Sequence, residues 1–180
     1  MARLDPLPLD KLSPEQKALH DELGRSRNGR VTGPFAVWLH TPAVCDAANK
    51  LTLSLRENGS VNKRLYELIT LIVTRHWSAQ YAWSQHVGPA AAAGISADVI
   101  DAIRHGRKPD MKADDERLVY EAVTELLERK PLSQATYDRM VKQFGVEHTV
   151  EIVSIVGLYS MVSTLLNAFD VPTLSGDKPF

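Results

Sequence analysis

The chain has 180 residues, 44% of them hydrophobic and 24% charged, and its 21 basic and 22 acidic residues leave a formal net charge of −1 at pH 7. This length and composition suit a globular chain with one sizeable core, so we expect a single domain over residues 1–180. The balanced charge excludes a whole-protein field that would attract nucleic acid or an anionic membrane. The N-terminal stretch has no apolar signal core, and the longest apolar stretches are interrupted before the roughly 20 residues of a membrane span. We therefore expect a cytoplasmic protein.

The N-terminal part of the chain begins without a helix signal. Two prolines in the first twelve residues predict an extended arm over residues 1–12. A helix should follow, because Ser13 can cap it, Pro14 suits its first position and Gln16 can complete a capping box. We expect this helix to run to about Leu23.

A short apolar patch at 33–40 is expected to send three side chains into the core, those of Phe35, Trp38 and Leu39. His40 ends the patch; it lies either beside a functional site or, in the interpretation that we favour, at the surface near a helix start. Cys45 is the only cysteine, which excludes an internal disulfide. We expect it to be a small buried residue of the next helix.

The other segments show helical spacing of apolar residues and no strand-like alternation. Outside the central stretch, helices are predicted over residues 41–58, 96–105, 114–130, 134–144 and 147–169. The first of these should bury Val44, Ala48, Leu51 and Leu55. Gly145 should separate the last two helices, and the final helix carries a buried face made of Ile152, Ile155, Val156, Tyr159, Val162 and Leu166. The prediction is an all-α fold.

The central stretch begins with a helix over residues 62–77 that is apolar on most sides. Its polar exceptions Glu67, Thr70 and Thr74 recur at three- and four-residue steps, so they share one stripe. A buried glutamate is rare unless it has a partner. Glu67 is therefore either half of an internal salt bridge or hydrogen bond, or a functional acid.

A second helix of this stretch is predicted from Ala79 onward, with Ser78 as its N-cap. Three small or aromatic residues share one side of it with His86: Ala79, Ala82 and Trp83. A histidine on a helix face is usually structural. However, a tight corner between two packed helices can bring Glu67 to His86, and a glutamate that orients an imidazole is a proton-transfer pair.

Four features of this stretch resemble the core of the carboxymuconolactone decarboxylase family, the all-helical superfamily that includes the alkylhydroperoxidase D proteins. They are Glu67, the run Tyr81, Trp83 and His86, the alanine-rich segment that follows, and the turn at Gly94 to Ser96. The closing segment from Gly157 to Phe169 is also similar. The resemblance implies an alkylhydroperoxidase D-like helical bundle that assembles into homotrimers, or into hexamers built from them.

Two departures from the family pattern limit the chemistry. In the peroxidase branch a Cys-x-x-Cys pair precedes the histidine, and its positions are Ala79 and Ala82 in this chain. Without sulfur there is neither a nucleophilic nor a resolving thiol, so thiol peroxidase activity is not expected. Many members of the non-redox branch carry a glutamate at the position of Ala82, so a second carboxylate is also missing.

The resemblance implies a cofactor-independent lyase or isomerase that acts on a small organic acid or lactone, as in the catabolism of aromatic compounds. In the family reaction carbon dioxide leaves a lactone acid and a proton returns to carbon. His86 and Glu67 would be the catalytic pair, with Tyr81, Trp83, Arg75 and Thr74 as substrate-binding residues. Alternatively, Arg75 forms an ion pair at the surface or between subunits. The scattered histidines make no metal-ligand pattern, so we expect no metal and no cofactor.

Two other function classes stay open at this stage. The first is a binding or structural oligomer that has kept the fold and lost the chemistry, which the two alanines favour. The second is a peroxidase, which is disfavoured because Cys45 has no second cysteine to resolve it.

Overall fold

The structure is a computed structural model that describes residues 2–25, 27, 29–129 and 131–180. Within these residues every regular element is helical, which confirms the all-α prediction. In chain order the elements are the 3-10 turn η1 Leu9–Lys11 and the helices α1 Pro14–Arg25, α2 Pro34–Trp38, α3 Pro42–Arg56, α4 Lys63–His76, α5 Gln80–Ala92, α6 Ala97–Arg104, α7 Asp114–Arg129 and α8 Gln134–Ala168. Met1 and Lys130, where the predicted arm begins and a predicted helix ends, lie outside the described residues.

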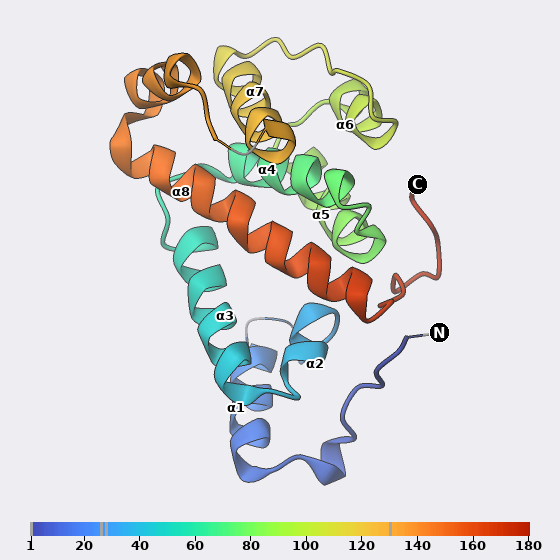
Figure 1. The fold of residues 1–180 in the computed structure, drawn as a ribbon. Helices are drawn as coiled ribbons and strands as arrows, with labels where there is room; N and C mark the ends of the chain where they lie inside the picture. Colours follow the sequence, from blue (N-terminus) through green and yellow to red (C-terminus); the bar gives the residue numbers. More distant parts are fainter. Residues whose placement is uncertain (1, 26, 28, 130) are drawn as a thin grey trace.

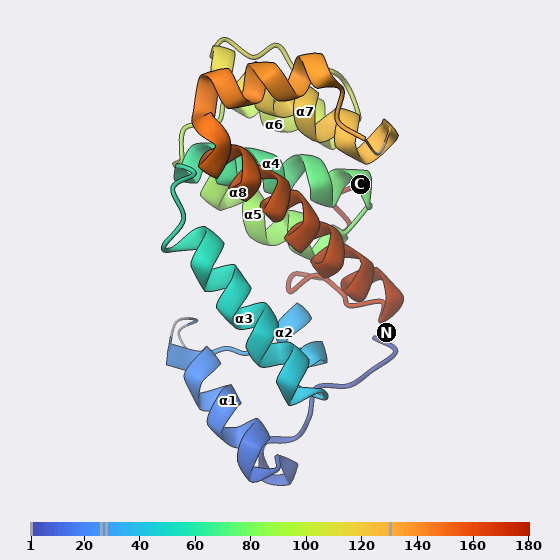
Figure 2. The same cartoon turned by 60° about the vertical axis from the view of Figure 1, so that its left-hand side comes forward.

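Helix α4 is the centre of the bundle. It packs against α5, α7 and α8, and it also contacts α6. Figure 1 shows α8 running diagonally across the molecule, with α6 and α7 toward one end and α1, α2 and α3 toward the other. The same two groups are separated in the rotated view of Figure 2. A functional side chain on α4 or α5 therefore lies where the two groups of helices meet.

The burial of α4 follows from this central position. All of its residues from Leu65 to Thr74 are buried, as expected for a helix that is covered on most sides. Asn62 caps the helix by accepting a hydrogen bond from the backbone N–H of Leu65 at 3.0 Å. Glu151 of α8 binds the N–H groups just before this cap, and the bond from Ser60 is 2.8 Å long. The start of α4 is thus tied to α8.

A tight corner joins α4 to α5. The N–H of Ala79 donates to the carbonyl of Thr74 at 2.8 Å, and the N–H of Ser78 donates to that of Arg75 at 3.0 Å, which is a Schellman motif. Ser78 takes the left-handed position of this motif, with φ of +52°. The prediction that Ser78 is the N-cap of α5 is therefore wrong, because this residue closes the preceding helix and Ala79 takes the N-cap position.

Helix α8 has 35 residues and two arms that meet at Gly145, whose φ is +79°. This break is where the sequence predicts the end of one helix and the start of the next, and Figure 2 shows the change of direction. All six residues predicted for the buried face of the second arm are buried. The break lets the first arm cover α7 while the second crosses α4.

Helix α8 also changes the expectation about membrane spans. It is long and apolar enough to cross a membrane by length and composition, with a mean hydropathy of 1.7 in its most apolar window. The prediction that every apolar stretch is too short was therefore wrong for this helix. Half of that window is buried within the protein, and the core helices of globular proteins meet the same two criteria.

The buried face of α3 is rotated from the predicted one. Val44 is 46% exposed and Leu51 is 41% exposed, whereas Cys45 and Asn49 are buried beside the predicted Ala48 and Leu55. A polar contact helps to fix this rotation, because Asn49 accepts a hydrogen bond from the Arg27 guanidinium at 3.0 Å. The prediction used only the spacing of apolar residues, so it could not take this hydrogen bond into account.

The N-terminal arm is extended except at the short turn η1, which the sequence analysis did not predict. The arm runs back to the end of α8, where the backbone N–H of Arg3 donates to the carbonyl of Phe169 at 2.9 Å. His40 binds the carbonyl of Asp5 in the arm at 3.2 Å, so it anchors the arm.

Candidate functional site

The central pair of the site consists of Glu67 on α4 and His86 on α5. The Schellman corner turns α5 back along α4, and Nδ1 of His86 lies 2.7 Å from Oε2 of Glu67. The sequence left open whether these two side chains touch, and the structure places them in contact. Glu67 is only 4% exposed, so the histidine supplies the polar partner that a buried carboxylate needs.

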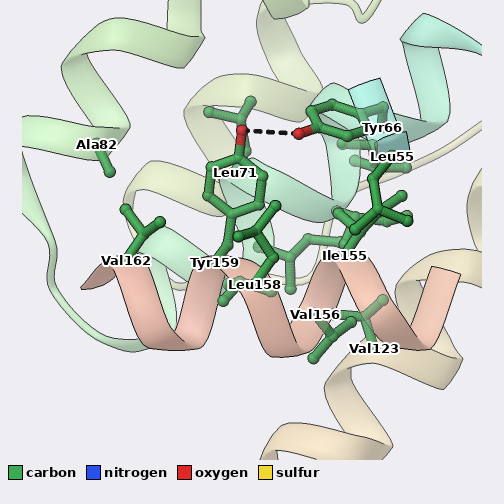
Figure 3. Packing of buried hydrophobic residues seen from close by; sticks show 14 of the residues in the cluster. Leu55, Tyr66, Leu71, Ala82, Val123, Ile155, Val156, Leu158, Tyr159 and Val162 are labelled. Atoms are coloured by element: carbon green, nitrogen blue, oxygen red, sulfur yellow. Dashed lines mark hydrogen bonds between the residues drawn. The ribbon is translucent and has the colours of Figure 1, made fainter. Parts of the chain in front are cut away.

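Two tyrosines extend the pair. The hydroxyl of Tyr159 on α8 lies 3.2 Å from Nε2 of His86 and 3.1 Å from the hydroxyl of Tyr66 on α4. Figure 3 shows the two tyrosine hydroxyls facing each other between α4 and α8. Burial raises the pKa of Tyr159 well above its usual range, and burial also raises the pKa of Tyr66. Both phenols therefore keep their protons at neutral pH and can donate hydrogen bonds.

A pocket with a volume of about 310 Å³ adjoins His86 between α3, α5 and α8. We call it the apolar pocket, because its lining includes the apolar side chains of Phe35, Ala82, Leu158, Val162, Leu166 and Leu174. Figure 3 shows Ala82 and Val162 pointing toward each other. A hydrophobic wall of this size with a few polar groups suits a small organic ring.

Three arginines give the apolar pocket a positive side: Arg27, Arg30 and Arg56. The Arg27 guanidinium lies over the ring of Phe35, 4.0 Å from its centre. Burial, followed by the nearby charge of Arg56, lowers the pKa of Arg27. Two cations held this close together repel each other, so an anion bound between them would be favourable.

A second pocket, of about 450 Å³, lies on the Glu67 side of the histidine. We call it the polar pocket, because its lining includes Arg56, Glu57, Lys63, Tyr66, Glu67 and Gln85. His86, Gln85 and Arg56 line both pockets, whereas Glu67 lines only the polar one. The histidine therefore stands between two cavities of different character.

Tyr81 is the one predicted substrate-binding residue that lines a pocket at His86. Its hydroxyl donates to Thr32 at 2.9 Å, and burial raises its pKa. Gly33 makes this placement possible, because a Cβ at that position would overlap the Tyr81 ring. Tyr81 is thus a fixed part of the pocket wall.

The other three predicted substrate-binding residues lie elsewhere, and their placement does not support that role. Thr74 is buried and donates to the carbonyl of Thr70 at 2.7 Å. Arg75 donates to the carbonyl of Arg104 at 2.7 Å and lines a different pocket, together with residues of α6 and α7. Trp83 is 2% exposed and packs edge to face against Phe180 at 5.3 Å. The prediction relied on how near these residues are to His86 in the sequence, and it did not consider that they lie on other faces of their helices.

The sequence analysis missed several residues of the site. Tyr159 appeared only as a core residue, and Tyr66 was not singled out, because a tyrosine at core spacing gives no sign that its hydroxyl faces a histidine. Arg27 and Arg56 were missed because their positions depend on how α3 and the preceding loop pack. The only available signal was composition, since Arg27 lies in an arginine-rich loop.

The two positions that carry cysteines in the peroxidase branch hold apolar side chains in this chain. Ala79 and Ala82 are both buried. Cys45 is on α3, as expected fully buried, and burial raises the pKa of its thiol to about 11, which disfavours the thiolate. In the part of the chain that the structure describes, no three His, Cys, Asp or Glu side chains are grouped to hold a metal ion. The absence of a cofactor stays a prediction.

Comparison with solved structures relates this geometry to known proteins. An alkylhydroperoxidase AhpD core, a peroxidase-related protein from Ralstonia eutropha JMP134, matches with a TM-score of 0.80 over 96% of this chain and 92% of the other, at 16% identity. The chain has the AhpD-like fold. A peroxidase-related protein from Silicibacter sp. TM1040 shares this fold, with a TM-score of 0.76 over 94% of this chain and 90% of the other, at 14% identity.

A third protein with the AhpD-like fold is a debrominase. Its cysteine-to-alanine variant, in complex with 2,3,4-tribromopyrrole, matches with a TM-score of 0.74 over 95% of this chain and 91% of the other, at 15% identity. No protein-family model and no curated protein sequence matches the chain. At these identities the likeness establishes the fold, and the activity has to be argued from the site.

Proposed function

We propose that the protein is a cofactor-independent lyase or isomerase of the carboxymuconolactone decarboxylase type, which moves a proton on a small organic acid or lactone. The observation that carries the proposal is the 2.7 Å hydrogen bond between Glu67 and His86 beside two pockets. A histidine changes its protonation near neutral pH, and a carboxylate on Nδ1 orients the ring and stabilises the imidazolium.

The pocket charges support an anionic substrate. Arg56 borders both pockets, with Arg27 and Arg30 on the apolar side and Lys63 on the polar side. Guanidinium groups bind carboxylates with two parallel hydrogen bonds. A lactone acid bound beside His86 would place its carboxylate against Arg56, which lines both pockets. Loss of carbon dioxide, or migration of a double bond, then requires one group to donate or accept a proton at carbon.

The direct test is turnover of a panel of unsaturated lactone acids, followed by carbon dioxide release and by the loss of ultraviolet absorbance. We expect His86→Gln to lower the rate by about a hundredfold or more, as disruption of a general acid–base pair does. His76→Gln is the matched control, because His76 is an exposed histidine at the end of α4. An undiminished rate in a folded His86→Gln protein would exclude the proposal.

A second candidate is a binding or structural oligomer without catalysis. Two observations favour it: both ring nitrogens of His86 already contact protein side chains, and Ala79 and Ala82 fill the positions of the family's thiols. Saturable binding of lactone acids without any turnover would select this candidate. A thiol peroxidase is the least favoured, because Cys45 is the only cysteine and is buried. Peroxide consumption that is lost in Cys45→Ser would revive it.

A homo-oligomer, trimer or hexamer, is part of the same proposal. Four exposed apolar residues follow one stripe of α8: Val146, Val150, Val153 and Met161. An exposed stripe of this kind is typical of subunit contacts. We expect Val150→Glu to shift the mass in light scattering toward the monomer.

We also propose a cytoplasmic location, a small-molecule partner and no nucleic-acid or membrane partner, consistent with the net charge of −1.

A further inference from the structure

His86 has no ring nitrogen left over for a substrate. Nδ1 is 2.7 Å from the Glu67 carboxylate, and Nε2 is 3.2 Å from the Tyr159 hydroxyl. The Tyr159 ring meets the imidazole edge to face, with centroids 5.0 Å apart. A molecule that approaches Nε2 must therefore displace Tyr159, which packing on α8 holds in place. The question is which atom of the pair can exchange a proton with a bound molecule.

The hydrogen bonds have a fixed direction. An ionised carboxylate only accepts, so the contact with Glu67 requires the proton on Nδ1 of His86. Neutral imidazole has a single N–H, and Nε2 must then accept the hydroxyl proton of Tyr159. The oxygen of Tyr159 can in turn accept from Tyr66 at 3.1 Å. All donors in the series Tyr66, Tyr159 and His86 thus point toward Glu67, and bonds aligned in one direction strengthen one another.

The two pockets reach this series at different points. Tyr159 and His86 line the apolar pocket, where Nε2 is covered by the tyrosine hydroxyl. Glu67 lines only the polar pocket, next to Lys63 and Arg56. His86 lines the polar pocket too, but both of its ring nitrogens are already bonded to protein side chains. The carboxylate is therefore the member of the pair that can take a proton from a molecule there, and two cations beside it suit a negatively charged molecule.

We propose that Tyr159 is a positioning residue that holds His86 as the Nδ1–H tautomer, so that Glu67 exchanges the proton with a molecule in the polar pocket. The second clause rests on the proposed function, whereas the first does not. A proton leaves carbon for a Glu67 oxygen, and the electron pair of the broken C–H bond stays on the molecule, delocalised into its carbonyl. The same carboxyl group returns the proton, so no oxidant or reductant is needed.

The tautomer is tested by nitrogen NMR of ¹⁵N-histidine-labelled protein, with the ring signals of His86 assigned by their loss in His86→Gln. In the wild type, above the pH at which the ring loses its charge, we expect a protonated Nδ1 and an unprotonated Nε2 that is shielded by a hydrogen bond. In Tyr159→Phe the Nε2 signal should move toward that of a free imine. Tyr66→Phe is the matched control, because it removes a hydroxyl and leaves the bond between Tyr159 and His86.

Two results of this experiment would overturn the proposal. One is a protonated Nε2 in the wild type. The other is an Nε2 signal that does not change in Tyr159→Phe while the amide spectrum shows a folded protein. A merely structural tyrosine would change stability without changing the tautomer or the shielding of Nε2.

The choice of pocket is tested by titration with paraconate, a small lactone acid. Lys63 lines only the polar pocket and Thr52 only the apolar one. We expect Lys63→Gln to weaken paraconate binding about threefold to fivefold, the size of one exposed ion pair, and Thr52→Val to leave it unchanged. Greater sensitivity to Thr52, or the absence of saturable binding to the wild type, would overturn the assignment to the polar pocket.

These measurements separate the inference from the proposed function. If the protein binds but does not catalyse, the tautomer and the response of Lys63→Gln persist while no lactone acid is turned over. If catalysis is real but the inference is wrong, His86→Gln abolishes turnover while Tyr159→Phe leaves both the Nε2 signal and the rate unchanged.

Discussion

Two regions of the central helices contain similar residues and differ in what they can do. The histidine region, made of Glu67, His86 and Tyr159, borders two pockets. In the tail region, made of Arg75, Trp83 and Phe180, the Phe180 ring packs on Trp83 and the Arg75 guanidinium lies 4.7 Å from the centre of the Phe180 ring. The pocket that Arg75 lines includes neither of these aromatic residues. A polar residue and aromatics close together therefore mark a site only where one cavity adjoins both.

The difference arises from which segment covers each region. The C-terminal tail occupies the tail region, where Phe180 accepts from and donates to the side chain of Gln80 and Pro179 accepts from Arg104. No residue of the C-terminal tail lines the polar pocket beside Glu67. The account therefore assigns stability to the tail region and chemistry to the histidine region, and each substitution below tests that division.

The largest effect on stability is expected from Trp83→Ala in the tail region. This change deletes a nearly fully buried indole and its contact with Phe180, and such deletions cost about 3–5 kcal/mol. Urea unfolding measures the loss. A cost below about 1 kcal/mol would show that the tail region collapses onto the vacated space and does not support the core.

The next largest effect is expected in the histidine region, where Glu67→Gln should lower the rate of turnover. Glu67→Gln keeps the shape but removes the charge that holds Nδ1–H of His86, so turnover of a lactone acid should fall about a hundredfold. The measurement is the steady-state rate, with circular dichroism as the control for folding. Unchanged turnover would remove Glu67 from the mechanism.

Gly33→Ala tests the wall of the apolar pocket. A Cβ would collide with the Tyr81 ring, and Gly33 also has a positive φ of 60°, so we expect a loss of about 1–3 kcal/mol. Tyr81→Ala should rescue part of that loss in the double variant, because it removes the collision. Thermal unfolding of the four proteins measures the coupling, and strictly additive losses would argue against the contact.

The buried tyrosines predict a dependence on alkaline pH. Burial raises the pKa of Tyr159 and of Tyr66 in the folded protein, so the folded state holds these protons more tightly than the unfolded chain. Their contribution is complete below about pH 10, the unfolded value, and is lost as the pH rises toward the raised folded values. Urea unfolding between these limits should show a shallower decline in Tyr159→Phe than in the wild type. Parallel declines would contradict the burial argument.

The smallest effect is expected from Arg75→Gln. The variant loses the hydrogen bond to Arg104 and the contact with the Phe180 ring, which together should cost at most about 1 kcal/mol because Arg75 is partly exposed. Turnover should not change. A large loss of rate would show that Arg75 takes part in the reaction and would contradict the division between the two regions.

Local signals in the sequence were sufficient for most of the fold. The capping box of Ser13 and Gln16 was confirmed, as was the break at Gly145, because each depends only on a few neighbouring residues. Ser78 was misread, since a serine after a helix can either begin the next one or close the last. Only the Schellman bonds between Thr74 and Ala79 decide between these alternatives.

The site was predictable only where one helix corner determines it. Glu67 and His86 lie on helices joined by a single tight turn, so the sequence indicated that the turn could bring them together, but not that they touch. Tyr159 lies on α8, 73 positions after His86, and Phe180 packs on Trp83 from the end of the chain. Both contacts depend on the packing of distant segments, which periodicity within one helix does not encode.

The most direct measurement of the division between the regions is deuterium incorporation from D₂O into paraconate, at the carbon next to its lactone carbonyl, followed by proton NMR. The account predicts exchange by the wild type and by Arg75→Gln at similar rates, and a rate about a hundredfold lower in Glu67→Gln and His86→Gln. Equal exchange in all four folded proteins, or no exchange by a wild type that binds paraconate, would contradict the claim that Glu67 and His86 transfer a proton.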